Sequence, residues 1–575
     1  MTDVRGLHRG FRNDYLDHGE VTAQLKAWAE AFPAFVRLTT LTTTAEGREQ
    51  WLLTIGREPD RLRPAVWVDG NMHASELCGS SVALAIAEDV IGLHADPAAT
   101  SGGLKSHMAD TLREVLFYVM PRMSPDGAEA VLKTGRYIRS VPRDARVNQL
   151  HPHWVSEDID GDGRALVMRV EDPTGEYVAS PDHDGLLLPR SLEDEGPFYK
   201  LYPEGRIENF DGVRIPDPSF IGDNEPDLNR NFPYGWAPEY DQIGAGRFPA
   251  SETESRAVVE FAEASPHIFA WLNLHTFGGV FIRPLGDHPD SKMDPSDLAL
   301  YRQIEAWGEE FTSYPTVSGF EEFTYEPDKP LHGDLTDWSY HARGCLTYVC
   351  ELWDLFEQVG LERPKRFVDR YTRLGRPELE KLAAWDREHN QGDALPPWTP
   401  VDHPQLGKVE VGGIDPRFGL WNPPRTKLAE VCEQHSAMFL RVAAMAPRVI
   451  VSPPAVRSRD GVHEIEVRIE NHGYLPTYVL SSAKKLPWNE PLYVQAEAHG
   501  CTLADARSAH QSLGHLDGWG RGLYDGSSAL YYMRSRGNRG REVWRATVRG
   551  TGELRLRIGS CRMGFQELLI PVTDP

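Results

Sequence analysis

The hexapeptide Asn71-Met72-His73-Ala74-Ser75-Glu76 stands where a predicted strand gives way to a predicted helix. Residues 65–68 form an apolar run that predicts a buried strand, and two turn-forming residues follow it. Residues 77–91 are rich in Ala, Val and Leu and predict a helix. His73 and Glu76 are therefore expected at the end of a strand, the edge at which open α/β sheets bind ligands.

The pair His73 and Glu76 has two explanations. An imidazole and a carboxylate three residues apart across such a turn can bind one metal ion. Alternatively, His73 caps the helix or bonds to backbone, and Glu76 is a solvated acid that the helix dipole favours. The pair alone leaves both alternatives open, because short motifs often match by chance.

Length and composition describe a large globular protein with two or three domains. The chain has 575 residues, of which 40% are hydrophobic and 25% charged, and its formal net charge is −24. This charge argues against a nucleic acid or an anionic membrane surface as partner. The sequence contains no run of about eighteen apolar residues that could span a membrane.

The cysteines and the first residues predict a cytoplasmic protein. The six cysteines are scattered without a CxxC pair, which argues against a disulfide framework or a thiolate zinc site. The first residues lack the apolar core of a signal peptide. We therefore expect a reducing, cytoplasmic environment.

Predicted strands and helices alternate as far as residue 446. Strands are expected at residues 36–43, 49–55, 65–68, 115–120, 268–274 and 345–350, and helices at 21–32, 77–91, 251–264, 297–311 and 427–446. This alternation is typical of a mostly parallel sheet covered by helices on both faces. Residues 134–226 interrupt it with a polar stretch rich in Gly, Pro and Asp, whose length indicates a functional or disordered loop.

The pattern changes after residue 446. From Val449 onward, short stretches of alternating polar and apolar residues are separated by Gly, Asn and Pro turns. This pattern predicts an all-β sandwich. We therefore expect a catalytic domain at residues 1–446 and a β-sandwich accessory domain at residues 447–575, with a role in packing or assembly.

Two further residues at strand ends complete a candidate catalytic site. His275 follows the apolar run 268–274, and Glu351 follows the run 345–350. Two histidines and one glutamate leave zinc an open position for water, which is the catalytic rather than the structural arrangement. Zinc makes water a nucleophile at neutral pH by lowering its pKa. Glu351 can then serve as general base.

The segment Asp227-Leu228-Asn229-Arg230-Asn231-Phe232 indicates a substrate site. Arginine beside asparagine is suited to a carboxylate, which it can bind by paired hydrogen bonds. Asp227 can orient a zinc-binding imidazole from behind. Each of these residues also has an ordinary structural explanation, but five such features at strand ends of one domain favour a site.

Together these motifs resemble the zinc carboxypeptidase family of the carboxypeptidase A type. The resemblance covers residues 15–440 and keeps the family's order and approximate spacing. It is carried by His73-x-x-Glu76, Pro121-Arg122-x-x-Pro125-Asp126-Gly127, Asp227-x-Asn229-Arg230-Asn231-Phe232, His275 and Glu351. It implies an α/β fold, an α/β/α sandwich around a mixed, mostly parallel sheet with the site at the strand ends.

The resemblance also implies roles for the site residues. One zinc ion per chain would be bound by His73, Glu76 and His275. The terminal carboxylate of the substrate would be held by Asn229 and Arg230. Glu351 would be general base and then general acid. The implied activity is that of a metallocarboxypeptidase acting on peptides with a free C-terminus.

Three positions depart from the family pattern. The family's arginine that polarises the scissile carbonyl has no unambiguous match, and Arg139 is the best candidate for it. The tyrosine that closes over substrate is expected near Lys329, and Tyr325 would serve only with a shifted loop. Thr336 stands at the floor of the specificity pocket and indicates neither basic nor aromatic substrates, whereas the nearby Asp334 could favour Lys or Arg.

A second metal site is a weaker hypothesis. Asp158, Asp160 and Asp162 have the spacing of the first ligands in a calcium loop, and Gly163 occupies its sixth position. The twelfth position is Arg169, where a glutamate is expected. The alternative to a Ca²⁺ site is a turn rich in aspartate.

Two other functions remain open. A zinc amidase or deacylase that cleaves small N-acyl amino acids would use the same residues, since its substrates also carry a carboxylate. An inactive protein that binds peptide C-termini would belong to another functional class. The complete ligand set and Glu351 argue against the inactive protein, because a binding protein needs no general base.

Overall fold

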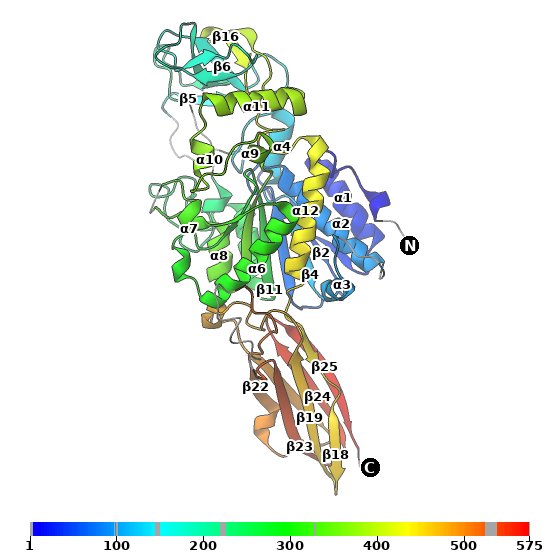
Figure 1. Ribbon diagram of the computed structural model, residues 1–575. Helices are drawn as coiled ribbons and strands as arrows, with labels where there is room; N and C mark the ends of the chain where they lie inside the picture. The colour runs from blue at the N-terminus through cyan, green and yellow to red at the C-terminus, as the bar shows by residue number, and fades with distance from the viewer. Residues whose placement is uncertain are drawn as a thin grey trace.

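The computed structural model describes residues 4–96, 98, 102–143, 150–218, 226–326, 329–523 and 537–573. An eight-stranded sheet forms its centre, in the order β1-β2-β4-β3-β11-β14-β12-β13 (Figure 1). Its strands are β1 (Val36–Thr43), β2 (Glu49–Ile55), β3 (Ala65–Gly70), β4 (Leu116–Met120), β11 (Ile268–Thr276), β12 (Val280–Arg283), β13 (Thr316–Ser318) and β14 (Leu346–Leu352).

The central sheet is mixed. Neighbouring strands run parallel from β4 through β3 and β11 to β14, and β12 is parallel to β13. The β1–β2, β2–β4 and β12–β14 pairs are antiparallel. Every residue of β3, β4 and β11 is buried, as expected for strands covered on both faces.

Helices cover both faces of the sheet, because alternate residues of each strand point to opposite sides. On one side, Val66 and Val68 join a core with α1 (His18–Ala31), α2 (Cys78–Ala95), α6 (Pro295–Thr312) and α12 (Arg425–Ala443). On the other side, Ala65 and Trp67 pack with α5 (Thr253–Ala264) and α8 (Leu335–His341). The predicted α/β/α sandwich around a mixed sheet is confirmed.

The remaining helices are short, with the exception of α11. They are α3 (Ser106–Leu112), α4 (Pro125–Thr134), α7 (Gly319–Glu322), α9 (Leu355–Gln358), α10 (Asp369–Thr372) and the longer α11 (Arg376–His389). Among the helices of the described ranges, α2 has the length and composition of a membrane span. It is 78% buried inside the protein, like the core helix of a globular domain.

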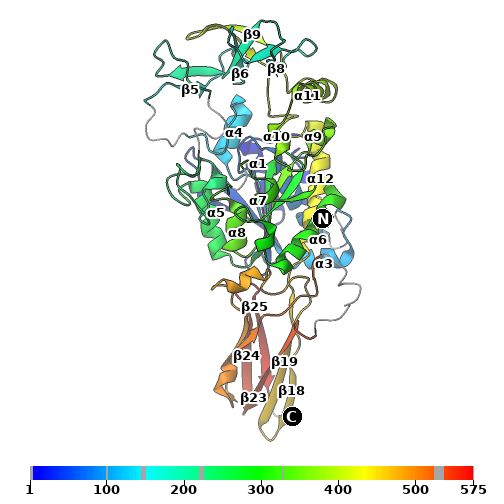
Figure 2. The same cartoon turned by 60° about the vertical axis from the view of Figure 1, so that its left-hand side comes forward.

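A second sheet lies beyond one end of the central sheet (Figures 1 and 2). Its six strands, in the order β15-β16-β6-β9-β7-β8, come from two distant parts of the chain. They are β6 (Val167–Glu171), β7 (Tyr177–Ala179), β8 (Leu187–Pro189), β9 (Phe198–Pro203), β15 (Thr399–His403) and β16 (Gly407–Gly412). A separate pair, β5 (His153–Ser156) and β10 (Gly205–Glu208), lies nearby.

This sheet corrects the interpretation of residues 134–226 as a loop. Within the described residues 150–218 the chain forms six short strands rather than irregular structure. Strand β6 pairs with β16, in which Glu410 lies opposite Arg169, 241 residues later in the chain, and β15 extends the sheet beyond β16. Residues 144–149 and 219–225 of this stretch lie outside the described residues.

The C-terminal part consists of two antiparallel sheets that share one hydrophobic core. One sheet contains β17 (Val449–Val451), β18 (Ala455–Arg459), β19 (Val462–Asn471), β21 (Thr502–Leu503) and β23 (Arg541–Arg549). The other contains β20 (Leu492–His499), β22 (His510–Gly514), β24 (Gly552–Ser560) and β25 (Gly564–Val572). The predicted all-β structure is confirmed, whereas the domain limits 1–446 and 447–575 stay a prediction.

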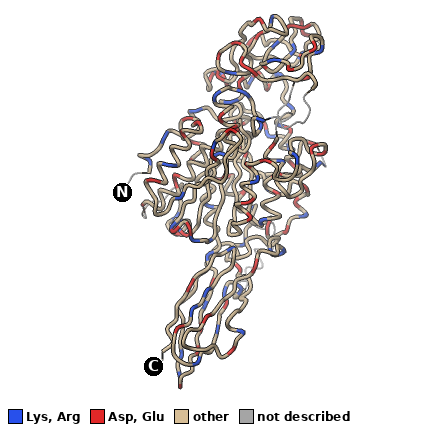
Figure 3. Tube along the Cα trace, turned by 180° about the vertical axis from the view of Figure 1, so that it is seen from behind, with Lys and Arg blue, Asp and Glu red and all other residues tan. Residues whose placement is uncertain are grey.

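Charged residues are spread over the whole molecule. Figure 3 shows acidic and basic residues interspersed in the central part and in both outer parts. Residues 447–575 nevertheless contain 17 Lys and Arg against 13 Asp and Glu, so the negative net charge lies within residues 1–446.

Arg562 joins the C-terminal sheets to the central sheet. Its fully buried guanidinium donates to the carbonyl oxygens of Ile268 (3.1 Å) and Arg343 (2.8 Å) and to Asn489 Oδ1 (3.2 Å). Ile268 is the first residue of β11, and Arg343 lies three residues before β14. The C-terminal part thus contacts the starts of these strands, opposite the ends that carry His275 and Glu351.

We expect Arg562→Met to lower the free energy of unfolding by about 3 kcal/mol, because several buried acceptors lose their donor. Urea unfolding of the full chain measures this change. Arg555→Met, on an exposed position of β24, is the matched control and should change stability by at most about 0.5 kcal/mol. Equal, small effects of both substitutions would contradict the assigned role of Arg562.

Candidate functional site

The turn between β3 and α2 is closely packed. An added Cβ on Gly70 would lie 2.4 Å from the backbone of Gly79, so only glycine permits this approach of strand and helix. Asn71 adopts a left-handed conformation (φ 58°), and its Nδ2 donates to the carbonyl oxygens of His73 (2.8 Å) and Ala74 (2.9 Å). These contacts fix the turn that carries His73 and Glu76.

The parallel register brings the site residues together. Strand β11 lies between β3 and β14, and its residue His275 is paired with Glu351 of β14. His73 and Glu76 follow the neighbouring end of β3. The predicted convergence at one edge of the sheet is thus present in the structure.

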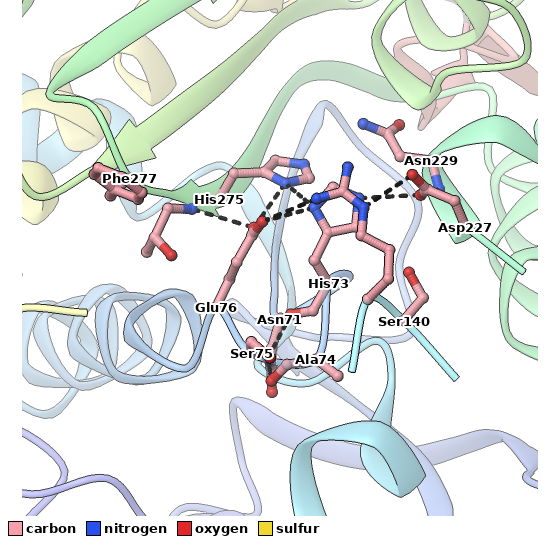
Figure 4. A network of polar contacts seen from close by, with 12 residues as sticks. Asn71, His73, Ala74, Ser75, Glu76, Ser140, Asp227, Asn229, His275 and Phe277 are labelled. Carbon is pink, nitrogen blue, oxygen red and sulfur yellow. Dashed lines mark hydrogen bonds and ion pairs between the residues drawn. The ribbon is translucent and has the colours of Figure 1, made fainter. Parts of the chain in front are cut away.

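The side chains of His73, Glu76 and His275 form one buried cluster (Figure 4). His73 Nδ1 lies 2.8 Å from Glu76 Oε1, and His275 Nδ1 lies 2.9 Å from Glu76 Oε2. Burial raises the pKa of Glu76, but the charges of the two histidines outweigh it and hold that pKa below its usual value. Burial lowers the pKa of His275.

The outer ring nitrogens of both histidines are held by hydrogen bonds. His73 Nε2 is 3.1 Å from Asp227 Oδ1, and His275 Nε2 is 2.6 Å from Asn273 Oδ1. Both acceptors favour a hydrogen on Nε2, which leaves the lone pair on Nδ1. The two Nδ1 atoms face each other at 2.9 Å. Two lone pairs this close, beside a carboxylate, suit a shared cation, so the residues fit zinc.

Asp227 and Arg139 form the next layer of the site. Asp227 is the N-cap of a short helical turn, Leu228–Arg230, and accepts from the backbone N–H of Asn229 (2.8 Å). Arg139 Nε donates to Asp227 Oδ2 (3.0 Å), and Arg139 Nη1 lies 3.6 Å from Glu76 Oε1. Although burial acts in the opposite direction, Arg139 and His73 hold the pKa of Asp227 well below its usual value.

All the predicted site residues line one cavity of about 670 Å³. They are His73, Glu76, Arg139, Asp227, Asn229, Arg230, His275, Thr336 and Glu351. Asn229 Oδ1 accepts from the N–H of Leu335 (2.9 Å), and Arg230 Nη1 donates to the carbonyl oxygen of Asn229 (2.7 Å). The cavity has the size of a small-molecule or peptide-end site.

Glu351 lies beside the metal-ligand cluster. Its Oε2 is buried and, among the described residues, accepts no hydrogen bond. Burial raises its pKa well above the usual value, and the charge of Glu76 adds to this effect, while Arg139 opposes it. Glu351 thus presents an unused acceptor atom to the cavity.

Two tyrosines that line the cavity were absent from the predicted site. The side chain of Tyr325 is 54% exposed and still reaches the cavity. Tyr371, in α10, donates its phenolic O–H to the carbonyl oxygen of Phe277. No sequence motif contains Tyr371, whereas Tyr325 was considered for the closing tyrosine only with a shifted loop.

The acids near Thr336 have structural contacts as well as a place in the cavity. Asp334 is the N-cap of α8 and accepts from the N–H of Asp337 (2.9 Å). Asp337 accepts from the N–H of Gly286 (2.9 Å). Burial raises the pKa of both carboxyl groups.

The predicted calcium loop is a turn rich in aspartate. Oxygens of Asp158, Asp160 and Asp162 lie within 4.8 Å of one another, in a group that is only partly buried. Asp158 accepts from the backbone N–H groups of Gly161 (2.6 Å) and Gly163 (2.9 Å). Arg169, at the twelfth position, donates instead to Glu410 (2.7 Å). The contacts favour the turn, and the Ca²⁺ site is not supported.

Two protein-family models match the chain. A family model described as zinc carboxypeptidase matches residues 21–160 and 217–367. A second model, described as a domain of unknown function, matches residues 449–570.

Individual relatives are distant. Mouse carboxypeptidase M is 30% identical over 119 residues, which cover 20% of this chain and 25% of that protein. Rat carboxypeptidase B2 is 20% identical over 371 residues, or 62% of this chain and 67% of that protein. The crystal structure of thrombin activatable fibrinolysis inhibitor is 16% identical, with a TM-score of 0.43, and the alignment covers 76% of this chain and 78% of that chain.

The length of these matches limits what the relatives imply. The matched segments span only 25% of mouse carboxypeptidase M and 33% of carboxypeptidase B from Astacus astacus. The zinc carboxypeptidase model, in contrast, spans half of this chain, and its two segments include His73, Glu76, His275 and Glu351. On this match the chain belongs to the zinc carboxypeptidase family, a family of metal-dependent hydrolases.

Proposed function

We propose that the protein is a zinc-dependent carboxypeptidase that hydrolyses the C-terminal peptide bond of peptides. The observation that carries this proposal is one cavity with three parts. A metal-ligand cluster and the unpaired carboxylate of Glu351 lie beside the carboxylate-binding pair Asn229 and Arg230. A metal-dependent enzyme that removes C-terminal residues needs all three parts at one place.

The zinc ligands would be His73, Glu76 and His275. When bound, zinc would polarise the scissile carbonyl and lower the pKa of water. Asp227 orients the imidazole of His73, and Asn273 orients that of His275. The ligands are therefore preorganised by hydrogen bonds behind them.

Glu351 would transfer the protons of the reaction. Its free Oε2 would accept a proton from the attacking water, and the same carboxyl group would deliver that proton to the departing amine. Burial raises its pKa, which makes its carboxylate a stronger base than a solvated glutamate.

Arg139 and Tyr325 would complete the site. The Arg139 guanidinium, held by Asp227, would donate to the developing oxyanion. Tyr325 lines the cavity from an exposed segment and would close over the substrate. Thr336 would contact the terminal side chain at the floor of the pocket.

We expect Arg230→Ala to impair cleavage of peptides with a free C-terminus far more than cleavage of C-terminally amidated peptides. Only the free terminus presents a charge to Arg230, and loss of a hydrogen bond to a charged group costs about 1.5–3 kcal/mol. The corresponding loss in kcat/KM is roughly tenfold to over a hundredfold.

The matched control is Arg283→Ala. Arg283 lines the same cavity but is already paired with Asp290, 3.1 Å from Arg283 Nε to Asp290 Oδ2. It should therefore affect both substrates alike. Equal losses of Arg230→Ala on both substrates would show that Arg230 does not bind the terminus.

A substrate panel tests the class of reaction. The proposal requires cleavage of short peptides, whereas faster cleavage of N-acyl amino acids would assign a deacylase to the same residues. We also propose a cytoplasmic location, which is supported by six free cysteines, five of them buried. The absence of nucleic-acid and membrane partners stays a prediction.

A further inference from the structure

A chain of buried hydrogen bonds leads from His275 into the centre of the sheet. His275 Nε2 contacts Asn273 Oδ1 (2.6 Å), and Asn273 Nδ2 donates to Asp69 Oδ1. The other carboxylate oxygen, Asp69 Oδ2, accepts from the indole N–H groups of Trp67 (2.8 Å) and Trp271 (2.7 Å). Asp69 and Asn273 are both completely buried.

The carboxylate of Asp69 has an unusual environment. In the described part of the chain, no Lys, Arg or His side chain forms an ion pair with it, and burial raises its pKa to about 7. Burying a carboxylate without a cation is costly, and here only three N–H donors offset that cost. The two indole rings stack at 4.8 Å between centroids, which holds both donors in place. So costly an arrangement beside a metal-ligand cluster calls for a function.

The hydrogen-bonding chemistry fixes the direction of the whole chain. Both indole N–H groups donate to Asp69 Oδ2, and the Asn273 amide turns its NH₂ group toward Asp69 Oδ1, which accepts from it. The amide oxygen of Asn273 then faces His275 and can only accept. His275 must therefore carry its hydrogen on Nε2, which leaves the lone pair of Nδ1 directed at His73 and Glu76.

We propose that Asp69 is a positioning residue for the zinc site, which acts through the Asn273 amide to hold His275 in the tautomer that can bind metal. This inference rests on the proposed zinc-dependent function. It parallels the role of Asp227, whose carboxylate contacts His73 directly. The two histidines are thus each oriented by a carboxylate, one in contact and one through an intervening amide.

The substitution Asp69→Asn tests the inference because it introduces an NH₂ group with little change of shape. Two indole donors require an acceptor at the Oδ2 position, so the new NH₂ group takes the place of Oδ1. It then faces the NH₂ group of Asn273, and the Asn273 amide must turn over. His275 Nε2 would receive an N–H donor, and its hydrogen would move to Nδ1, where zinc must displace it.

We expect Asp69→Asn to weaken zinc affinity by about 10–100-fold, the usual cost of losing a group that supports a ligand. Zinc affinity of the full-length protein is measured by competition with a chelating indicator. Trp67→Phe is the matched control, because it also removes one hydrogen bond from Asp69 but leaves the Asn273 amide unchanged. It should retain wild-type zinc affinity.

A double-mutant cycle separates positioning from general destabilisation. Asn273→Leu removes the link, so adding Asp69→Asn to it should cause no further loss of zinc affinity. Equal losses in both backgrounds, or an unchanged affinity of Asp69→Asn, would overturn the proposal. If Asp69→Asn does not fold, as judged by the thermal unfolding of the zinc-free protein, the zinc affinity of Asn273→Leu alone is the test. Wild-type affinity in that variant would also overturn it.

The same measurement separates this inference from the proposed function. A wild-type protein without zinc affinity would contradict the proposed function. A wild-type protein that binds zinc, with additive losses in the cycle, would contradict only the role of Asp69.

Discussion

Replacement of Glu351 by glutamine is expected to lower kcat on a short peptide by at least about 10²–10⁴-fold, the usual contribution of general acid–base catalysis. Glutamine keeps the size and shape of the side chain but cannot accept a proton. The loss should be larger if Glu351 transfers both protons of the reaction. Zinc binding and peptide binding should persist, because Glu351 is not among the proposed metal ligands.

The measurement compares kcat with the affinity of the same peptide for the zinc-loaded variant. Glu357→Gln, six residues further and exposed on α9, is the matched control and should leave kcat unchanged. Near-native turnover of Glu351→Gln would place the general base elsewhere in the cavity. A wild-type protein that binds peptide termini but cleaves neither peptides nor N-acyl amino acids would contradict the enzyme proposal.

Removal of either zinc-binding imidazole is expected to abolish stable zinc binding. His73→Ala and His275→Ala each delete one of three ligands, so the loss of affinity should exceed the roughly 10–100-fold that loss of a supporting group costs. Metal analysis should find about one zinc per wild-type chain and little in either variant.

An exposed histidine provides the control for this experiment. His389, at the end of α11, is exposed, and His389→Ala should keep the full zinc content. Glu76→Gln should behave like the histidine variants, because a neutral amide is a poorer zinc ligand than a carboxylate. Full zinc retention by both His73→Ala and His275→Ala would contradict the assigned site.

Much of the fold was predictable from local patterns. The apolar runs at 65–68 and 268–274 are β3 and β11, and both strands are fully buried. A run of apolar residues predicts a buried strand, because its side chains point to both faces of the sheet and both faces must then be covered from water. Residues that follow such strands must lie at one edge of a parallel sheet, which is why His73 and His275 were predicted to converge.

The C-terminal sheets were predictable for a similar reason. In β19 (Val462–Asn471) every second residue is buried, which is the alternation expected of a strand with one face on a core. The contact between the C-terminal sheets and the central sheet could not be predicted from the sequence. This contact of Arg562 with β11 joins residues almost three hundred positions apart, and no local pattern contains such a contact.

Local pattern also failed for residues 150–218, where short polar strands were interpreted as a loop. A strand with little apolar alternation is stabilised by its partners, and here β6 pairs with β16 from residues 407–412. Such a pairing depends on register and packing across the whole chain. The alternation Lys408-Val409-Glu410-Val411 is typical of a strand, but it does not identify the strand with which β16 pairs.

By itself, the sequence determined which residue types stand at the strand ends, and therefore the zinc ligands, the base and the carboxylate-binding pair as candidates. The tertiary structure alone decided how those groups are supported. The link from Asp69 through Asn273 to His275, and the entry of Tyr325 and Tyr371 into the cavity, follow from contacts between distant segments. The direction of a hydrogen bond depends on which donor and acceptor face each other after packing, and spacing along the chain does not record it.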